Sequence, residues 1–249
     1  MPHAASIAHD SQAPKERWLT APLLAAVPGL VHGFSTRALG DQSLATPDHR
    51  WVAELGMVEL ALLRQVHGTA VVAPGSPSGA AGGRPEGDAW AGRPAPGHLF
   101  GILTADCLPV VLVHPPSGRL AVVHAGWRGA VGGVAEAALA SLGVPAGEVL
   151  AALGPAIGPC CYQVGEEVAA AVGAGSPHLS PWPGAPGHFA FDLPGALRER
   201  LLTAGVRTRH IDRLAPCTHC DADRFYSHRR ATEPQRMVAF AGWRPGDSP

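Results

Sequence analysis

The hydrophobic pattern of the chain consists of short apolar runs separated by turn residues. Alternating or continuous apolar stretches favour strands, whereas apolar positions three or four residues apart favour helices. Strands are predicted on this basis at residues 30–36, 65–72, 120–124 and 149–153. Helices are predicted at residues 48–64, 131–142, 166–172 and 193–204. Residues 99–114 predict either a pair of strands or a strand, a turn and a helix.

Turn-forming residues determine the expected domain organisation. The chain has 31 glycines and 25 prolines, which crowd into loops at residues 74–87 and 173–188. Strand-like and helical segments alternate without a linker-like break, so we expect a single α+β domain over residues 17–245. Residues 1–16 are largely polar and contain no apolar stretch of signal-peptide length. We expect them to form a flexible leader.

Charge and cysteine content exclude several classes of protein. The chain has 19 Lys and Arg against 20 Asp and Glu, so it has no general attraction to nucleic acid or anionic lipid. Its most apolar run, residues 99–113, contains Asp106 and Pro109 and is too short to cross a bilayer. Five cysteines do not suggest a disulfide scaffold. We therefore expect a cytoplasmic monomer or weak homodimer with no nucleic-acid or membrane partner.

Several common catalytic motifs are absent from the sequence. It contains no phosphate-binding loop, no dinucleotide-binding glycine motif and no nucleophile elbow. Residues 216–220 match the cysteine half of the zinc deaminase signature, but the H-x-E half is missing. The sequence therefore disfavours these standard sites.

Three apolar runs end at turns that carry side chains able to bind a metal. Residues 64–68, 104–109 and 122–129 present His67, Cys107 and His124 in this way. Two imidazoles and one thiolate suit zinc, and three protein ligands leave a fourth position open, as in catalytic zinc sites. The ion would lower the pKa of bound water to about 7. Alternatively, Cys107 is a nucleophile activated by a histidine, with Asp106 or the other histidine orienting that base.

Four ordered segments of the chain have specific sequences. They are Gln65-Val66-His67-Gly68, Thr104-Ala105-Asp106-Cys107-Leu108-Pro109, His124-Ala125-Gly126-Trp127-Arg128-Gly129 and Gly154-Pro155-Ala156-Ile157-Gly158-Pro159-Cys160-Cys161-Tyr162. Together they resemble the signature segments of the YfiH family, whose members have been called laccase-domain proteins, multicopper polyphenol oxidases and peptidoglycan editing factors. The chain departs from the family pattern in a short loop at residues 38–49 and in Gln235-Arg236, where Gly-Arg is usual.

The resemblance implies a single-domain four-layer αββα sandwich with mixed sheets, and a metal held by His67, Cys107 and His124. It also implies a zinc-dependent purine nucleoside phosphorylase acting on adenosine, inosine, guanosine or methylthioadenosine. Purine nucleoside and phosphate would be its partners, and adenosine deamination would be a side activity. Copper is the alternative cofactor.

Further residues near these motifs are candidates for binding or catalysis. Arg128, Arg37 and Arg64 could hold phosphate, although a salt bridge or a solvated surface position is the alternative for each. Trp127 could stack on a purine or pack in the core. Tyr226 could line the pocket or lie on an exposed strand. Asp106 could shuttle protons, orient a histidine or cap a turn.

The remaining cysteines and three competing functions stay open. Cys160 and Cys161 are expected to be small buried thiols. Cys217 and Cys220 could bind a second metal, alone or with that pair. The competing functions are a copper-dependent polyphenol oxidase, a Cys-His hydrolase or amidase in peptidoglycan precursor editing, and a non-enzymatic binding module.

Overall fold

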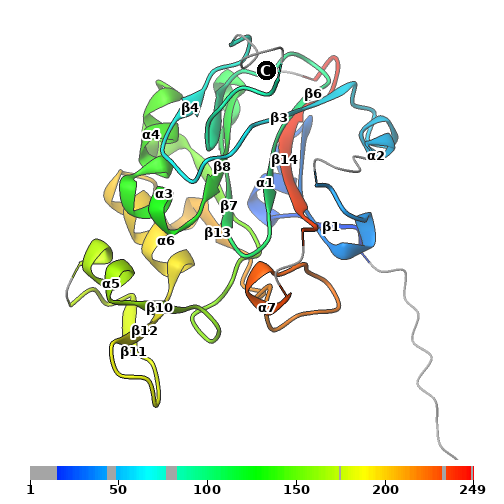
Figure 1. Cartoon of the computed structure of the whole chain (residues 1–249). Coiled ribbons are helices and arrows are strands. Elements are labelled where there is room, and N and C mark those ends of the chain that lie inside the picture. The colour runs from blue at the N-terminus through cyan, green and yellow to red at the C-terminus, as the bar shows by residue number, and fades with distance from the viewer. Residues whose placement is uncertain (1–15, 44–48, 77–82, 174, 232–233, 248) are drawn as a thin grey trace, which may run out of the picture.

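The computed structural model of the chain describes residues 16–43, 49–76, 83–173, 175–231, 234–247 and 249 (Figure 1). In this part of the chain, two mixed β-sheets pack face to face and helices lie on their outer faces. The chain therefore has the single-domain α+β sandwich, with αββα layers, that the family resemblance implies. The expected leader, residues 1–16, lies outside the described residues except for Glu16.

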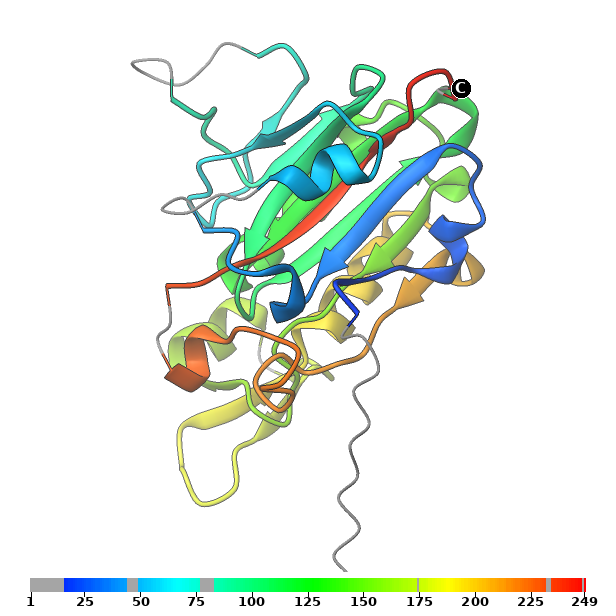
Figure 2. The ribbon, with the colours of Figure 1, turned by 90° about the vertical axis from the view of Figure 1, so that its right-hand side faces the viewer.

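The first sheet has five strands. In spatial order they are β1 (Trp18–Leu19), β2 (Leu30–Ser35), β14 (Met237–Trp243), β6 (His98–Thr104) and β3 (Glu59–Leu62). Strand β3 runs parallel to β6, and the other neighbours are antiparallel. The short helix α2 (Arg50–Glu54) covers the outer face, where the rings of Trp51 and Phe240 lie 4.8 Å apart (Figure 2).

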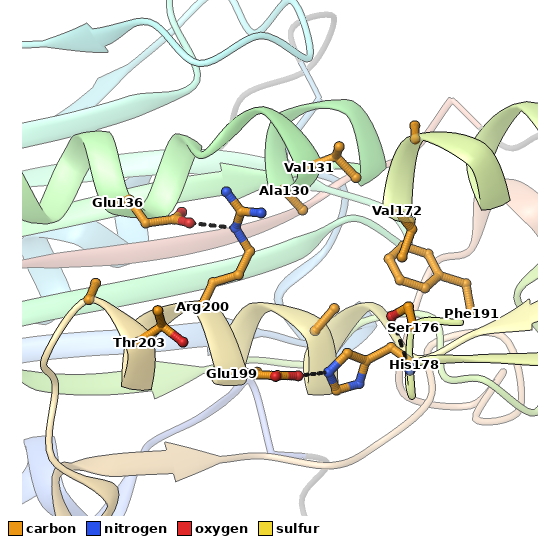
Figure 3. A pocket seen from close by; sticks show the side chains of 13 residues that line it. Ala130, Val131, Glu136, Val172, Ser176, His178, Phe191, Glu199, Arg200 and Thr203 are labelled. Carbon is orange, nitrogen blue, oxygen red and sulfur yellow. Dashed lines mark hydrogen bonds and ion pairs between the residues drawn. The ribbon is translucent and has the colours of Figure 1, made fainter. Parts of the chain in front are cut away.

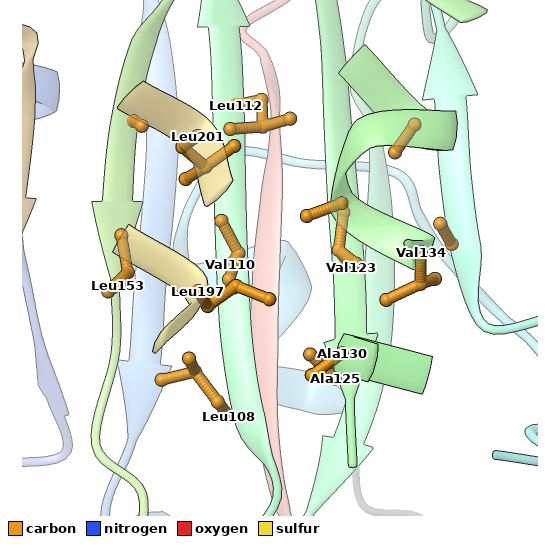
Figure 4. Packing of buried hydrophobic residues seen from close by; sticks show 14 of the residues in the cluster. Leu108, Val110, Leu112, Val123, Ala125, Ala130, Val134, Leu153, Leu197 and Leu201 are labelled. Carbon is orange, nitrogen blue, oxygen red and sulfur yellow. The ribbon is translucent and has the colours of Figure 1, made fainter. Parts of the chain in front are cut away.

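The second sheet has six strands. In spatial order they are β13 (Ile211–Arg213), β9 (Leu150–Leu153), β7 (Leu108–His114), β8 (Arg119–Ala125), β5 (Ala89–Gly92) and β4 (Val71–Val72). The pairs β13–β9 and β4–β5 are parallel, and the others are antiparallel. Its outer face is covered by α3 (Trp127–Gly132), α4 (Val134–Ser141) and α6 (Leu193–Thr203) (Figure 4).

Strand β7 contributes to two hydrophobic clusters, one on each face of the second sheet. Leu108, Val110 and Leu112 pack against the helices (Figure 4). Val111 and Val113 pack against the five-stranded sheet. Successive side chains of a strand point to opposite faces, and both faces are covered here, so the whole strand is apolar. Burial of each aliphatic side chain stabilises the fold by about 1.5–3 kcal/mol. The buried strands therefore form a rigid base for the turns at their ends.

Smaller elements extend from the sandwich. A third sheet of β10 (Gln163–Gly165), β12 (His188–Phe191) and β11 (Leu179–Pro181) lies beside α5 (Glu166–Val172) (Figure 1). The remaining α-helices among the described residues are α1 (Pro22–Ala25) and α7 (His228–Ala231). The longest α-helix among the described residues, α6, has 11 residues, and no described helix has the length and apolarity needed to span a bilayer.

Several predicted elements are confirmed. The strands predicted at residues 30–36, 120–124 and 149–153 correspond to β2, β8 and β9. The helices predicted at residues 131–142, 166–172 and 193–204 correspond to α4, α5 and α6. Residues 99–114 form two strands, β6 and β7, as one of the two alternatives predicted. The two strands belong to different sheets and do not pair with each other. The turn between them therefore crosses from one layer to the other.

Two predicted elements are wrong, and one predicted loop contains a strand. The helix predicted over residues 48–64 is only α2, because Gly56 follows it with a φ of +74°, a left-handed conformation that favours glycine. Residues Glu59–Leu62 then pair with β6 as a strand, so pairing overrides the local helical spacing. The strand predicted at residues 65–72 is limited to Val71–Val72. The loop predicted at residues 173–188 also contains β11.

Candidate metal centre

Three turns at one edge of the sandwich carry the predicted metal ligands. His67 lies in the loop after β3, Cys107 directly precedes β7, and His124 lies near the end of β8. Strands β7 and β8 are antiparallel neighbours, with Leu108 opposite Ala125, so the start of one lies beside the end of the other. Strand pairing therefore brings Cys107 and His124 together, and the loop after β3 adds His67.

The three side chains have the spacing of a metal site. Their ligand atoms all lie within 4.8 Å of one another, and Cys107 Sγ lies 3.9 Å from His67 Nε2. Bonds of about 2.0–2.3 Å to a tetrahedral zinc would place such atoms roughly 3.3–3.6 Å apart. The rings of His67 and His124 meet edge to face at 4.8 Å between centroids. The donor set and its spacing therefore fit one ion after small side-chain adjustments.

Asp88, which directly precedes β5, organises this centre from behind. Its side chain is completely buried, and its Oδ1 lies 2.9 Å from His124 Nδ1. A proton on Nδ1 donated to this carboxylate leaves Nε2 of His124 as the metal-binding atom. The sequence pattern did not indicate Asp88 as a site residue. A lone aspartate at the start of a strand carries no local signal for this role.

The same carboxylate shapes the backbone of the loop that carries His67. The amides of His67 and Gly68 donate to Asp88 at 2.9 and 2.7 Å, and the amide of Val66 donates at 3.4 Å. His67 has a φ of +60°, which is uncommon for a residue other than glycine. Converging hydrogen bonds on a buried carboxylate offset this strain of about 1–3 kcal/mol. One side chain thus orients both predicted histidine ligands.

Mutual contacts shift the pKa values at this centre. Burial raises the pKa of the Cys107 thiol, but hydrogen bonds with His124 and His67 outweigh it and bring the pKa down to about 6. Burial lowers the pKa of His124, but Asp88 and Cys107 outweigh it and raise the pKa to about 9. Burial raises the pKa of Asp88, but hydrogen bonds from His124 and the backbone lower it overall. These contacts favour a thiolate at neutral pH, the form that binds metals and attacks electrophiles.

A cavity of about 650 Å³ opens beside the ligand cluster. Its lining includes His67, Cys107 and His124, together with the cationic side chains of Arg64 and Arg236. His228 of α7 lines this cavity and a smaller one of about 130 Å³ that also contains Cys107. A ligand in the larger cavity would therefore contact both the metal ligands and positive charge. The sequence pattern indicated neither Arg236 nor His228 as a site residue.

The remaining candidate binding residues lie in different surroundings. Arg64 lines the larger cavity and forms an ion pair with Glu86. The Arg128 guanidinium lies 4.2 Å from the centre of the Trp127 ring and 3.4 Å from the Glu167 carboxylate. Among the described residues that line the two cavities, neither Arg128 nor Trp127 is present. The structure therefore brings Arg64, but not this stacked pair, to the ligand cluster.

Arg37 and Tyr226 form a second stacked pair. The Arg37 guanidinium lies 4.5 Å from the centre of the Tyr226 ring, and the tyrosine is buried. Neither residue is among the described residues that line the two cavities at Cys107. Tyr226 therefore does not lie on an exposed strand, which was the alternative. It is buried beneath the Arg37 guanidinium.

Asp106 lies next to Cys107 in the chain, but its side chain binds residues outside the metal-ligand cluster. It has a φ of +84°, and its carboxylate accepts hydrogen bonds from Thr218 Oγ1 at 2.6 Å, Ser227 Oγ at 3.0 Å and the Arg229 amide at 2.7 Å. These bonds hold the turn before β7 against the segment that leads into α7. The geometry favours Asp106 as a residue that positions Cys107.

A further cavity, of about 510 Å³, lies among α3, α4, α5 and α6 (Figure 3). On its lining, Arg200 pairs with Glu136 and His178 pairs with Glu199 (Figure 3). Among the described residues, the two groups with metal-ligand spacing both lie elsewhere. The chemistry of the molecule is therefore concentrated at the strand ends rather than on the helical face.

Comparison with known proteins shows which sequences and structures the chain resembles. The family model described as multi-copper polyphenol oxidoreductase laccase matches residues 37–244. The chain is 40% identical over 156 residues to purine nucleoside phosphorylase YlmD of Geobacillus stearothermophilus, covering 59% of this chain and 57% of that protein. The crystal structure of YlmD superimposes with a TM-score of 0.79 at 31% identity, covering 94% of this chain and 98% of that one.

Two further relatives extend the comparison. A purine nucleoside phosphorylase of Deinococcus radiodurans is 38% identical over 250 residues, covering 90% of this chain and 92% of that protein. An adenosine deaminase from an unknown prokaryotic organism is 38% identical over 143 residues, covering 54% of this chain and 53% of that protein. The matched regions thus span just over half of YlmD and of the deaminase, but nearly all of the Deinococcus protein.

Proposed function

Because the chain belongs to the family described as multi-copper polyphenol oxidoreductase laccase, whose relatives above are named purine nucleoside phosphorylase or adenosine deaminase, we propose that it is a zinc-dependent purine nucleoside phosphorylase. Adenosine deamination is proposed as its side activity. The observation that carries the proposal is the cluster of His67, Cys107 and His124 on the wall of a cavity that also holds Arg64 and Arg236. A cavity of about 650 Å³ falls in the usual range for small-molecule sites.

The proposed phosphorolysis transfers the ribosyl group from a purine to phosphate. A phosphate oxygen forms a bond to C1′ of ribose while the bond from C1′ to the purine nitrogen breaks, and the purine nitrogen takes up the proton that the phosphate releases. Arg64 supplies positive charge to the phosphate and can exchange its partner Glu86 for that anion. Arg37, Arg128, Trp127 and Tyr226 remain proposed contacts for substrate parts that extend beyond the cavity.

The proposed deamination uses the same cavity. Water adds to C6 of adenine, and the amino group leaves as ammonia, which converts adenosine to inosine. His67, Cys107 and His124 would hold the ion, which supplies Lewis acidity to an oxygen nucleophile when bound. Asp88 would keep His124 in the metal-binding tautomer. Asp106 would position Cys107 through its bonds to Thr218 and Ser227.

Zinc fits the donor set better than a multicopper centre. Two imidazoles and one thiolate suit zinc, whereas several copper ions require many more histidines. Among the described residues, the two groups with metal-ligand spacing are this cluster and a group of four cysteines. Copper-dependent phenol oxidation therefore remains the weaker candidate. A copper-loaded protein that oxidises phenols faster than the zinc-loaded protein cleaves inosine would reverse this order.

A phosphorolysis assay tests the main proposal. Phosphate-dependent release of hypoxanthine from inosine should disappear after treatment with a chelator and return on addition of zinc. His124→Ala should abolish both the activity and the return. His98→Ala is the matched control, because that histidine pairs with Glu59 away from the cavity. Activity that persists in the His124→Ala protein, or that needs no phosphate, would overturn the proposal.

A metal-free cysteine hydrolase is the second candidate, and the contact between Cys107 and His67 favours it. Cys107 Sγ lies 3.9 Å from His67 Nε2, and hydrogen bonds with His124 and His67 bring the pKa of Cys107 down to about 6. Iodoacetamide should label Cys107 in the metal-free protein, and zinc should block the labelling if the thiolate is a ligand. Hydrolysis of an amide substrate by the metal-free protein, inhibited by zinc, would favour the hydrolase.

A further inference from the structure

Four cysteines outside the proposed active site form a second cluster. Cys160, Cys161, Cys217 and Cys220 each present a sulfur, and all four sulfurs lie within 4.8 Å of one another. The expectation that Cys160 and Cys161 are buried is wrong, because Cys160 is exposed and Cys161 is half-buried. They lie on a tight turn, in which the amides of Cys161 and Tyr162 both donate to the Gly158 carbonyl, rather than inside a core.

The fold brings two distant segments together to make this cluster. Residues 154–162 follow β9, and residues 214–221 follow β13. These two strands are parallel neighbours, so the chain leaves both of them at the same edge of the sheet. Beyond that edge Ala156 pairs with Cys217, and the Thr218 amide donates to the Ala156 carbonyl at 3.0 Å. The cysteines therefore meet through strand pairing and not through a flexible contact.

The distances between the sulfurs match a shared ion. Cys220 Sγ lies 3.5 Å from Cys160 Sγ and 3.3 Å from Cys161 Sγ. Four bonds of about 2.3 Å to a tetrahedral zinc place sulfurs roughly 3.8 Å apart. The five cysteines of the chain are all free thiols. Thiols at this separation are too far apart for a disulfide bond of about 2.05 Å and are close enough to bind one metal.

Backbone amides also prepare one of these sulfurs for a negative charge. The Gly158 amide donates to Cys217 Sγ at 3.2 Å. The amides of His219 and Cys220 also donate hydrogen bonds to this sulfur. Amide donors stabilise a thiolate, which is the form that binds a metal. A side chain at position 158 would put its Cβ 3.3 Å from Cys160 Sγ, so glycine allows this close approach.

We propose that Cys160, Cys161, Cys217 and Cys220 bind a second zinc ion, which has a structural role. Four thiolates fill a tetrahedral zinc site and leave no open position, unlike the three-ligand centre at Cys107. Soft sulfur ligands select zinc over magnesium or calcium. The site uses different residues from the proposed catalytic centre, so it stands or falls independently of the proposed enzyme activity.

The second ion would brace the turn that positions the proposed active site. Thr218, which follows Cys217, donates from Oγ1 to Asp106, the residue before Cys107. The Arg230 guanidinium donates to the Thr218 carbonyl at 2.9 Å and thereby connects the same turn to α7. Binding to the turn at Cys160 and Cys161 would hold this network in one arrangement. Loss of the ion should therefore loosen the Asp106 turn without removing a catalytic ligand.

Zinc content of the purified full-length protein tests the proposal. The unmodified protein should contain two zinc ions per chain, because its two sites have separate ligands. Cys217→Ser should contain one, and Cys107→Ser should also contain one because it disrupts only the other site. The double variant should contain none. A zinc content that Cys217→Ser leaves unchanged, or a wild-type protein with one ion that Cys107→Ser removes, would overturn the proposal.

Cobalt substitution distinguishes a tetrathiolate site from adventitious binding. In the Cys107→Ser background, the cobalt-loaded protein should show sulfur-to-cobalt charge-transfer bands and the intense visible bands of tetrahedral cobalt. If Cys217→Ser does not fold, Cys160→Ser carries the test, because its side chain is exposed, and it should lose zinc at a lower chelator concentration. Unchanged chelator sensitivity, octahedral cobalt spectra, or disulfides in place of the five free thiols of the unmodified chain would contradict the proposal.

Discussion

Replacement of Asp88 by asparagine removes the negative charge that orients both proposed histidine ligands. The carboxylate is completely buried and lies within 3.0 Å of His124 Nδ1 and of the amides of His67 and Gly68. An asparagine keeps one acceptor oxygen but turns the other position into an NH₂ donor. That donor would face the Gly68 amide, which is itself a donor. The substitution therefore leaves at least one of these backbone amides without its acceptor and weakens the bond to His124.

The expected effect on stability follows from these contacts. Hydrogen bonds to charged groups contribute about 1.5–3 kcal/mol each, and the Asp88→Asn protein loses or weakens about two of them. We expect the free energy of unfolding of the metal-free protein to fall by about 3 kcal/mol. Removal of the carboxylate partner of a metal-bound histidine typically weakens metal affinity 10–100-fold. Both effects should appear, because Asp88 supports the loop of His67 and the tautomer of His124.

Two measurements and one matched control separate these effects. Urea unfolding of the metal-free protein gives the stability change, and zinc competition against a chromophoric chelator gives the affinity change. Asp192→Asn is the control, because Asp192 accepts from the Gly195 amide at 3.0 Å and from Arg213 at 3.1 Å, away from the metal centre. The control should lower stability and leave the affinity of the centre at Cys107 unchanged. Measurement in the Cys217→Ser background confines the titration to this centre.

Two results would refute the reasoning that Asp88 orients both ligands, and a third would limit its role. If the folded Asp88→Asn protein bound zinc within twofold of the parent, the carboxylate would not orient the ligands. Equal losses of affinity in the Asp88→Asn and Asp192→Asn proteins would also refute it, because they would reflect general destabilisation. A large loss of stability with unchanged affinity would reduce Asp88 to a structural support for the loop.

Three further predictions concern pH, packing and phosphate. Burial lowers the pKa of His32 to about 4 from an unfolded value of about 6.5, so its neutral form stabilises the fold above pH 6.5 and this contribution is lost as pH falls toward 4. Urea unfolding should show about 2 kcal/mol of this loss at pH 5, and His32→Gln should remove it; an unchanged profile would contradict the shift. Gly126→Ala would place a Cβ 2.9 Å from His67 Cδ2 and 3.3 Å from Cys107 Sγ, so a ligand side chain must shift and zinc binding at that centre should weaken in a folded protein. Gly165→Ala, where nothing lies within 4 Å, should bind zinc normally, and equal binding by both variants would show that the contact is tolerated. Arg64→Gln should raise the KM for phosphate about 10–100-fold with a smaller change in the KM for inosine, whereas Arg119→Gln, which loses a bond to a backbone carbonyl on the helical side, should change neither.

The local sequence pattern predicted an element correctly where the apolar positions of that element face a buried surface in the fold. The apolar runs at residues 120–124 and 149–153 predicted buried strands correctly, because both faces of the second sheet are covered and every position can be apolar. The helix at residues 193–204 was also predictable, since its apolar face packs on that sheet. The pattern failed at residues 48–64, where Gly56 ends a short helix and Glu59–Leu62 pairs with β6. Pairing partners are not encoded in local spacing.

The sequence by itself determined which residue types could do chemistry: two histidines and a cysteine at turns after apolar runs, and four further cysteines in two short segments. Only the tertiary structure decided which of them meet. The register of β7 with β8 brings Cys107 to His124, and the parallel pairing of β9 with β13 brings Cys160 to Cys217. Asp88 had no signal in the sequence, because a lone acidic residue gains its role only when strand pairing buries it behind two ligands. Periodicity records the preference of each segment for its own backbone conformation, whereas contacts between distant residues depend on pairing and loop paths that short windows of sequence do not contain.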